Sequence, residues 1–241
     1  MNKAKPYILF ISLFAYLIIV LTFASVKRKE VVCKDLHVEI KDTEINSFIE
    51  DADVERLIRS SYGEIIDRPV DQIDKDRIEQ VLISNSVIKS AQVYNSLDGS
   101  FHVEVTQRRP ILRVMSHGGY YVDEDGEIMP LSNKYTARVL IASGNISREF
   151  ACKCLYPYVL SLRKDKFWDA YIEQIIVKDE DNIVLIPKVG NFTIILGSLG
   201  NAEEKMRNLR SFLKEGIVKK GWNTYKEINL KFDKQIVCVK R

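Results

Sequence analysis

The side chains best suited to acid–base chemistry are three histidines, His37, His102 and His117. Histidine is the most frequent general base because it titrates near neutral pH. A serine hydrolase would place its serine in a G-x-S-x-G turn, which is absent here, although a triad can also assemble from residues distant in sequence. His37 and His102 alternate with apolar residues, and His117 precedes two glycines. We therefore interpret them as surface residues and expect no enzymatic activity.

Asp123, Asp125 and Gly126 form a D-x-D-G sequence, which opens many calcium loops. Such a loop also needs a glutamate at its twelfth position, where this chain has Lys134. The turn of a β-hairpin uses the same residue types. We predict a hairpin turn and no metal; its acidic tip is either a simple turn or a contact surface.

The sequence Gly197-Ser198-Leu199-Gly200 lies between an expected strand and an expected helix, where phosphate-binding loops occur. The remainder of a G-x-x-x-x-G-K-[ST] motif is missing. Instead, the following helix opens with Asn201, Ala202, Glu203 and Glu204, whose carboxylates favour the helix dipole and repel phosphate. We predict an N-capped connection here, and no cofactor.

Four cysteines, Cys33, Cys152, Cys154 and Cys238, would permit three disulfide pairings. Their spacing selects none of these pairings. Cys152 and Cys154 form a C-x-C sequence instead of the C-x-x-C of redox and zinc sites. We interpret the cysteines as small apolar side chains, and the sequence leaves their oxidation state open.

Composition places the chain among folded proteins, because 46% of its 241 residues are hydrophobic. The formal net charge is only +3, and basic and acidic residues are interspersed. A nucleic-acid-binding protein would more often show a basic stripe, so we expect no nucleic-acid partner.

Residues 7–24 read YILFISLFAYLIIVLTFA and contain no charged residue. A helix of this length spans about 27 Å, close to the hydrocarbon thickness of about 30 Å. The alternatives are a buried core helix and a signal peptide cleaved after Thr22-x-Ala24, but the apolar run is longer than a usual signal-peptide core. We predict that residues 1–25 hold a short cytoplasmic tail and a single transmembrane anchor.

The orientation of this anchor does not follow from charge alone. Lys3 and Lys5 precede the apolar run, whereas Lys27, Arg28 and Lys29 follow it, so the positive-inside rule leans slightly against an external body. A short tail inside and a large body outside is mechanically simple. We expect a cytoplasmic N-terminus and a body on the outer side of the inner membrane.

After a linker at residues 26–35, the sequence predicts a small β-α-α-β-β unit. Alternation predicts strands at 36–40, near 91–93 and at 101–105, the last two joined by a turn at Asp98-Gly99. Between them, one helix is expected to be capped by Asp53 and another to begin near Asp74. Their apolar stripes are Val54, Leu57, Ile58 and Tyr62, and Ile78, Val81 and Leu82.

Beyond Pro110 the sequence predicts a mixed β domain with two helices, which makes the whole chain an α+β protein. A hairpin is expected to pair residues 120–122 with 128–131. The predicted helices cover residues 147–162 and 201–218. Further strands are predicted at 138–141, 172–177, 183–186, 192–196, 225–232 and 235–239.

Four pieces in this order resemble the bacterial FtsQ/DivIB cell-division family over nearly the whole chain: the apolar N-terminal segment, the β-α-α-β-β unit ending in FHVEVTQRRPILRV, the hairpin YYVDEDGEIMPLS, and NLKFDKQIVCVK near the end. The resemblance implies a POTRA domain at residues 36–107 and the family's β domain at 108–241. It also implies a non-catalytic scaffold without cofactor or small-molecule substrate.

The resemblance implies further that the protein binds the FtsB and FtsL coiled-coil pair at the division septum and contacts other division proteins. It also implies a role in the regulation of septal peptidoglycan synthesis. The alternative is a POTRA-containing protein-translocation or outer-membrane assembly factor, which normally carries repeated POTRA units.

The candidate partner-binding residues lie in two segments, the last predicted strand and the junction of the two domains. The last predicted strand can lie at a sheet edge, where an added strand would satisfy its unpaired backbone groups, and the resemblance places FtsB there. The alternative is that this strand only completes the core. Arg108 and Arg109 precede Pro110 at the domain junction. Their residue types alone favour a solvated surface, whereas the resemblance implies a contact with other division proteins. The residues matched on the strand are Phe232, Lys234, Gln235, Val237 and Val239.

Overall fold

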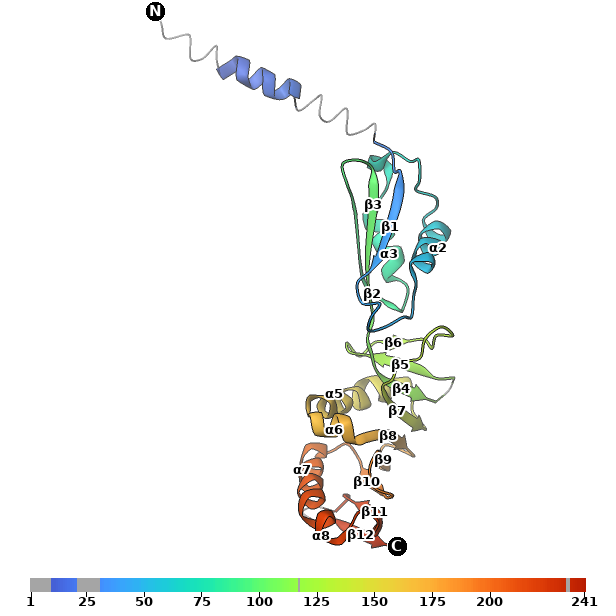
Figure 1. Ribbon diagram of the computed structural model, residues 1–241, viewed down its shortest axis with the longest axis vertical. Helices are drawn as coiled ribbons and strands as arrows, with labels where there is room; N and C mark the ends of the chain where they lie inside the picture. The colour runs from blue at the N-terminus through green and yellow to red at the C-terminus, as the bar shows by residue number, and fades with distance from the viewer. Residues whose placement is uncertain (1–9, 21–30, 117, 233–234) are drawn as a thin grey trace, which may run out of the picture. The chain divides into compact units, whose positions relative to one another are not determined.

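The computed structural model describes residues 10–20, 31–116, 118–232 and 235–241. The chain divides into two compact units, Met1–Gln107 and Arg108–Arg241. Figure 1 colours the first from blue to green and the second from green to red. Each unit has its own hydrophobic core.

Residues 10–20 form a helix whose side chains are exposed. Across the described ranges, we find no helix with the length and apolar character needed to cross a membrane. The flanking parts of the predicted anchor, residues 7–9 and 21–24, lie outside the described residues. The transmembrane anchor therefore stays a prediction.

The first unit contains a three-stranded sheet in the order β1-β3-β2. β1 (Asp35–Ile40) runs parallel to β3 (Ser100–Gln107), and β2 (Ile88–Asn95) runs antiparallel to β3. Phe101, Val103 and Val105 are buried while their neighbours in sequence are not, which confirms the alternation predicted for this strand.

Beyond residue 30, this unit also contains two helices and a short 3-10 turn: α2 (Asp51–Ser61), η1 (Val70–Gln72) and α3 (Lys75–Ile83). Their buried side chains, Val54 and Ile58 in α2 and Ile78 and Leu82 in α3, share one core with the inner face of the sheet. The predicted β-α-α-β-β order is confirmed.

The caps of the two helices differ in how well the sequence predicted them. Asp74 caps α3 by accepting a hydrogen bond from the N–H of Arg77 at 3.0 Å, as expected. The prediction that Asp53 caps the first helix was wrong, because the N-cap is Glu50. Asp53 lies three residues later and accepts the N–H of Glu50 at 3.1 Å, which makes a reciprocal capping box.

The second unit is built on a nine-stranded mixed sheet in the order β12-β11-β10-β9-β8-β7-β4-β5-β6. The pairs β4–β7, β7–β8 and β10–β11 are parallel, and the others are antiparallel. The strands are β4 (Pro110–Met115), β5 (Tyr120–Asp123), β6 (Ile128–Met129), β7 (Leu140–Gly144), β8 (Ile172–Val177), β9 (Ile183–Pro187), β10 (Thr193–Gly197), β11 (Tyr225–Asn229) and β12 (Val237–Lys240).

Most predicted strands of this sheet are confirmed, with shifts at their ends. The hairpin pairs Tyr121 with Met129 and Val122 with Ile128. The strand predicted at 138–141 begins later, at Leu140, and the strand predicted at 225–232 ends earlier, at Asn229. The strand predicted at 235–239 begins at Val237.

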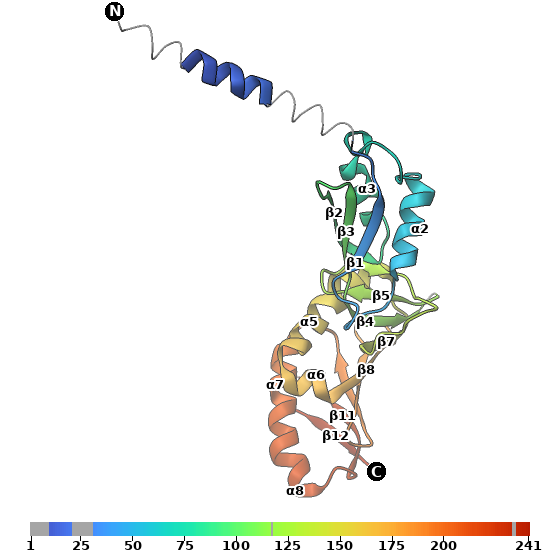
Figure 2. The same cartoon turned by 45° about the horizontal axis from the view of Figure 1, so that its top comes forward.

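Helical segments gather on one side of β8 to β12 in both views (Figures 1 and 2). The two predicted helices are present, and each contains a π-helical turn. They are α4 (Arg148–Phe150), η2 (Ala151–Leu155) and α5 (Tyr156–Lys164), and then α7 (Ala202–Phe212), η3 (Leu213–Ile217) and α8 (Val218–Lys220).

A third helix, α6 (Lys166–Tyr171), corrects the expectation of two helices. Asp165 caps it by accepting the N–H of Phe167 at 3.0 Å. Its six residues are too few to show a helical period, and three of them are aromatic, with only modest helix propensity.

Candidate functional site

The histidines of the first unit form a stack, not a catalytic triad. His102 stacks between His37 and Tyr94, with ring centroids 5.3 Å and 5.1 Å away. Its Nε2 lies 3.1 Å from the Ser96 hydroxyl, but Asp35 pairs with His37 instead, at 3.0 Å. In the described chain, no carboxylate hydrogen-bonds to the histidine that contacts a serine. His117 lies outside the described residues.

Asp123 organises the turn of the β5–β6 hairpin. Its carboxylate accepts the N–H groups of Asp125 and Glu127 at 2.9 Å and 2.7 Å, and a guanidinium hydrogen bond from Arg108 at 2.9 Å. The side chain is fully buried. Both oxygens thus serve the fold, which confirms a hairpin turn at the D-x-D-G sequence.

The connection before α7 does not have the cap predicted from sequence. Asn201 occupies the N-cap position with a left-handed φ of 54°, and its side chain makes no capping hydrogen bond. Lys205 instead donates to the carbonyl oxygens of Leu196 and Ser198 at 3.1 Å and 2.9 Å. This loop therefore presents carbonyl oxygens to the Lys205 ammonium, whereas a phosphate-binding loop presents backbone N–H groups to an anion.

The cysteines are all free thiols in the structure. Cys33 is completely buried, and Cys152 and Cys238 are half-buried. Burial raises the pKa of these three thiols above its usual range, so they are poor nucleophiles. In the part of the chain that the structure describes, no group of three potential metal ligands comes together.

β12 lies at the edge of the nine-stranded sheet and pairs on one side only, with β11. No other described strand covers its second side. Val237 and Val239 are 41% and 47% exposed, whereas Cys238 between them packs against the core. The strand thus exposes two apolar side chains beside an unpaired backbone edge.

The outward backbone groups of β12 follow from its pairing. The N–H of Arg241 donates to the carbonyl of Thr224 across the strand pair. Because backbone groups alternate sides along a strand, Val237 and Val239 also turn their N–H groups toward β11. The N–H groups of Cys238 and Lys240 therefore face the open edge.

The remaining predicted partner residues are divided between two places. Phe232, 49% exposed, and Gln235 precede β12 and line a small hollow against α7. Lys234 lies outside the described residues. Arg109 is exposed, whereas Arg108 is 19% exposed and engaged by Asp123.

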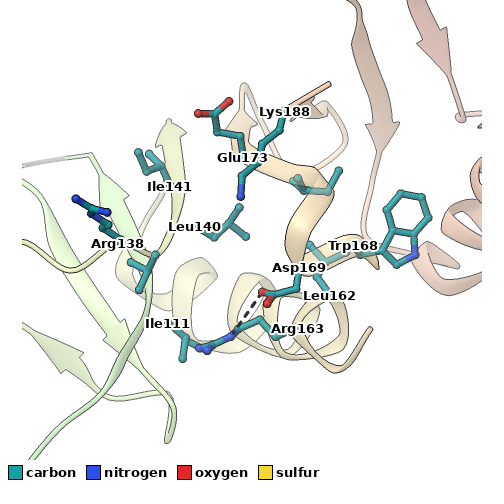
Figure 3. A pocket seen from close by; sticks show the side chains of 12 residues that line it. Ile111, Arg138, Leu140, Ile141, Leu162, Arg163, Trp168, Asp169, Glu173 and Lys188 are labelled. Atoms are coloured by element: carbon teal, nitrogen blue, oxygen red, sulfur yellow. Dashed lines mark ion pairs between the residues drawn. The ribbon is translucent and has the colours of Figure 1, made fainter. Parts of the chain in front are cut away.

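A larger groove of about 550 Å³ lies at the beginning of β7 and β8, beside α5 and α6 (Figure 3). Five charged side chains border it. This groove could not be predicted from the sequence, because its residues come from four distant segments and only packing brings them together. The apolar lining is Ile111, Val139, Leu140, Ile141, Leu162, Trp168 and Ile172, and the charged residues are Arg138, Arg163, Asp169, Glu173 and Lys188.

Comparison with known families gives two matches in chain order. A family described as "FtsQ/DivIB, C-terminal related" matches residues 109–239, and a "POTRA-like domain" matches residues 31–106. A search of curated proteins found no match. The family match includes the groove and, in β12, the residues from Val237 to Val239.

Proposed function

The chain belongs to the FtsQ/DivIB family of cell-division proteins, and we propose that it is a non-catalytic scaffold of the septal machinery. In this proposal the body binds the FtsB and FtsL coiled-coil pair outside the cytoplasm and helps regulate septal peptidoglycan synthesis. Residues 1–25 anchor it in the inner membrane. The family match over residues 109–239 favours division over the alternative of protein translocation.

The open edge of β12 is the observation that carries this proposal. An added strand gains hydrogen bonds to outward N–H and C=O groups, and side chains at alternate positions supply specificity. β12 offers the N–H groups of Cys238 and Lys240, together with exposed Val237 and Val239. A partner strand on this edge would extend the existing sheet without rearranging its core.

Removing one outward donor tests this mode of binding. Lys240 is exposed, and Lys240→Pro removes its N–H while leaving the bonds to β11 in place. Lys240→Ala is the matched control, because it removes the same side chain and keeps the donor. With the full chain in detergent micelles and the purified FtsB–FtsL pair, we expect at least tenfold weaker binding for the proline variant only.

The melting temperature of each variant decides how to interpret this comparison. Weaker binding by Lys240→Pro with an unchanged melt supports strand addition. Equal binding by folded Lys240→Pro and Lys240→Ala contradicts it. If the pair does not bind the wild-type chain, the proposed partner is wrong.

A further inference from the structure

An apolar side chain projects from the tip of the β2–β3 hairpin, residues 95–100. Leu97 is 89% exposed, the largest exposed fraction among the large apolar side chains that the structure describes. It occupies a turn, where polar residues and glycine predominate in soluble proteins. A single exposed apolar residue is common on protein surfaces, so its significance depends on what lies beside it.

The hairpin turn holds Leu97 in this outward position. The N–H of Ser96 donates to the carbonyl of Ser100 at 2.9 Å, and the N–H of Gly99 donates to the carbonyl of Ser96 at 3.3 Å. The Asp98 carboxylate accepts the N–H of Ser100 at 3.1 Å. These bonds fix the residues on both sides of Leu97, so its exposure is built into the turn.

The same tip receives the chain where it enters the first unit. The N–H of Lys34 donates to the carbonyl of Gly99 at 3.1 Å. Gly99 has a φ of +98°, and an added Cβ would lie 2.3 Å from the carbonyl oxygen of Val32, so glycine is needed for this close approach. Val32 also bridges Pro69 and is 38% exposed. The entering chain therefore lies against the hairpin tip, beside Leu97.

The length of chain before this point keeps the tip near the predicted anchor. Six residues, 25–30, separate the end of the apolar run from Val31. Even fully extended, six residues reach no further than about 22 Å. A contact that is too weak to hold a free domain becomes effective when a short covalent tether keeps its local concentration high. The bilayer surface is thus the surface that the tip meets most often.

The charges around the tip also suit a bilayer better than a strongly charged partner. Lys34 and Arg68 are exposed, and so are Asp67 and Asp98. A nucleic acid or another polyanion would meet carboxylates as well as cations. Zwitterionic headgroups carry both signs of charge, and the acyl chains beneath them can accept Leu97. Side chains of interfacial segments are buried in this way, about 5–10 Å into the boundary between headgroups and acyl chains.

We propose that the β2–β3 hairpin tip inserts into the surface of the membrane that holds the anchor, with Leu97 among the upper acyl chains and Val32 at the headgroups. The inference rests on the anchor of the proposed function and adds a second membrane contact to it. Two contacts fix the first unit more firmly than a tether alone. β3 would then lead away from the bilayer, and the far end of the unit would stay clear of lipid.

Tryptophan fluorescence tests this insertion in the full chain, reconstituted in phosphatidylcholine vesicles with either plain or brominated acyl chains. Bromine quenches an indole that enters the acyl region. The chain has two tryptophans, Trp168 and Trp222, and the wild type supplies their background. We expect brominated lipid to lower the emission added by Leu97→Trp by about twofold. The loss should persist at high salt, because the contact is apolar.

Ile45→Trp is the matched control at the far end of the unit. Ile45 is 56% exposed, and its neighbour Asn46 accepts a hydrogen bond from Gln107. Gln107 ends β3, seven residues after Ser100, or about 23 Å at about 3.3 Å per residue. Brominated lipid should leave the emission of this variant unchanged.

A second pair of variants tests the native leucine. Val32→Trp places the indole beside Leu97, and brominated lipid should quench it. In Val32→Trp/Leu97→Gln the quenching should fall, because a polar side chain no longer holds the tip in the bilayer. If Leu97→Trp alters the melting transition, this pair decides alone. Equal quenching in both members of the pair would overturn the role of Leu97.

The outcomes separate the tip from the anchor. Emission of a normally melting Leu97→Trp that brominated lipid leaves unchanged, in protein that floats with the vesicles, overturns the inference while the anchor stands. A blue shift without quenching would mean that protein, such as a second copy of the chain, covers the tip, and it overturns the inference as well. Wild-type chain that does not float with the vesicles rejects the anchor of the proposed function, and the inference with it.

Discussion

The guanidinium of Arg108 donates a hydrogen bond to the fully buried carboxylate of Asp123, with 2.9 Å between Nη1 and Oδ2. Arg108 is the first residue of the second unit, and Asp123 ends β5. The same carboxylate accepts two backbone N–H groups of the hairpin turn. This ion pair therefore ties the beginning of the unit to its first hairpin.

Arg108→Ala is expected to destabilise the second unit, because a buried carboxylate would lose its cationic partner. Removing one member of a buried pair typically costs about 3–5 kcal/mol, and partial exposure of Arg108 lowers our expectation to about 2–4 kcal/mol. The measurement is denaturant unfolding of the purified chain. Arg109→Ala is the control, with an expected change below about 0.5 kcal/mol because its side chain is exposed. Equal stability of the two variants would contradict the structural role of the pair.

Gly126→Ala is expected to destabilise the hairpin for two reasons. The backbone φ is +85°, and an added Cβ would lie 3.1 Å from the ring of Tyr156. Gly118 provides a matched control, since its φ is +91° and nothing lies within 4 Å of an added Cβ. We expect Gly118→Ala to cost about 1 kcal/mol from backbone strain alone, and Gly126→Ala to cost more. Thermal melting of both variants measures the difference. A smaller drop in melting temperature for Gly126→Ala than for Gly118→Ala would contradict this prediction.

The sequence predicted those parts of the fold that have a local signature. Alternation located β3, β8 and the β5–β6 hairpin, and Asp74 marked the beginning of α3. β4 was missed because it lies inside the sheet, between β7 and β5: Ile111, Leu112 and Val114 are buried, so the strand lacks simple polar–apolar alternation. Pro110, at the first position of β4, also suggested a boundary between secondary-structure elements.

In the candidate site, too, the features with a local sequence signature were predictable and those that depend on tertiary contacts were not. A strand near the end of the chain was predictable from residues around Val237 and Val239, and so was its capacity to form an edge. The direction of each N–H group was not, because it depends on the register with β11. The engagement of Arg108 by Asp123 and the assembly of the groove also required tertiary contacts between distant residues.

The Asp165–Arg210 pair predicts a pH dependence of stability. Arg210 donates to the Asp165 carboxylate at 2.6 Å and also lies over the rings of Phe167 and Trp168. This hydrogen bond is the main reason that the pKa of Asp165 is lowered below its usual range. A depressed carboxyl pKa contributes stability at neutral pH, and that contribution is lost as the pH falls through the folded-state pKa.

Asp165→Asn is therefore expected to melt below the wild type at neutral pH. The difference in melting temperature should narrow below about pH 4, as the wild-type carboxyl becomes protonated. Asp169→Asn is the control, because the Asp169 carboxylate is 55% exposed and lies 3.9 Å from Arg163. A difference that stays constant from neutral to acid pH would contradict the charge as its source, because asparagine can cap α6 as well as aspartate does.

The exposed valines of β12 provide the last prediction, on side-chain recognition at the edge. Val237 and Val239 are 41% and 47% exposed and share one face of the strand, whereas Cys238 packs toward the core. Val237→Ser/Val239→Ser should thus change the free energy of unfolding by less than about 1 kcal/mol in total. Binding of the FtsB–FtsL pair should fall about tenfold or more, because buried apolar contacts across an added strand would be lost.

Cys238→Ser provides the opposite comparison, since it changes the core side of the same strand. We expect it to lower the melting temperature while leaving the affinity of the folded protein close to that of the wild type. The affinities are measured by titration at a temperature well below both melting transitions. Wild-type affinity in the double-serine variant would show that partner side chains do not rest on this face, and it would confine any contact at β12 to the backbone groups tested by Lys240→Pro.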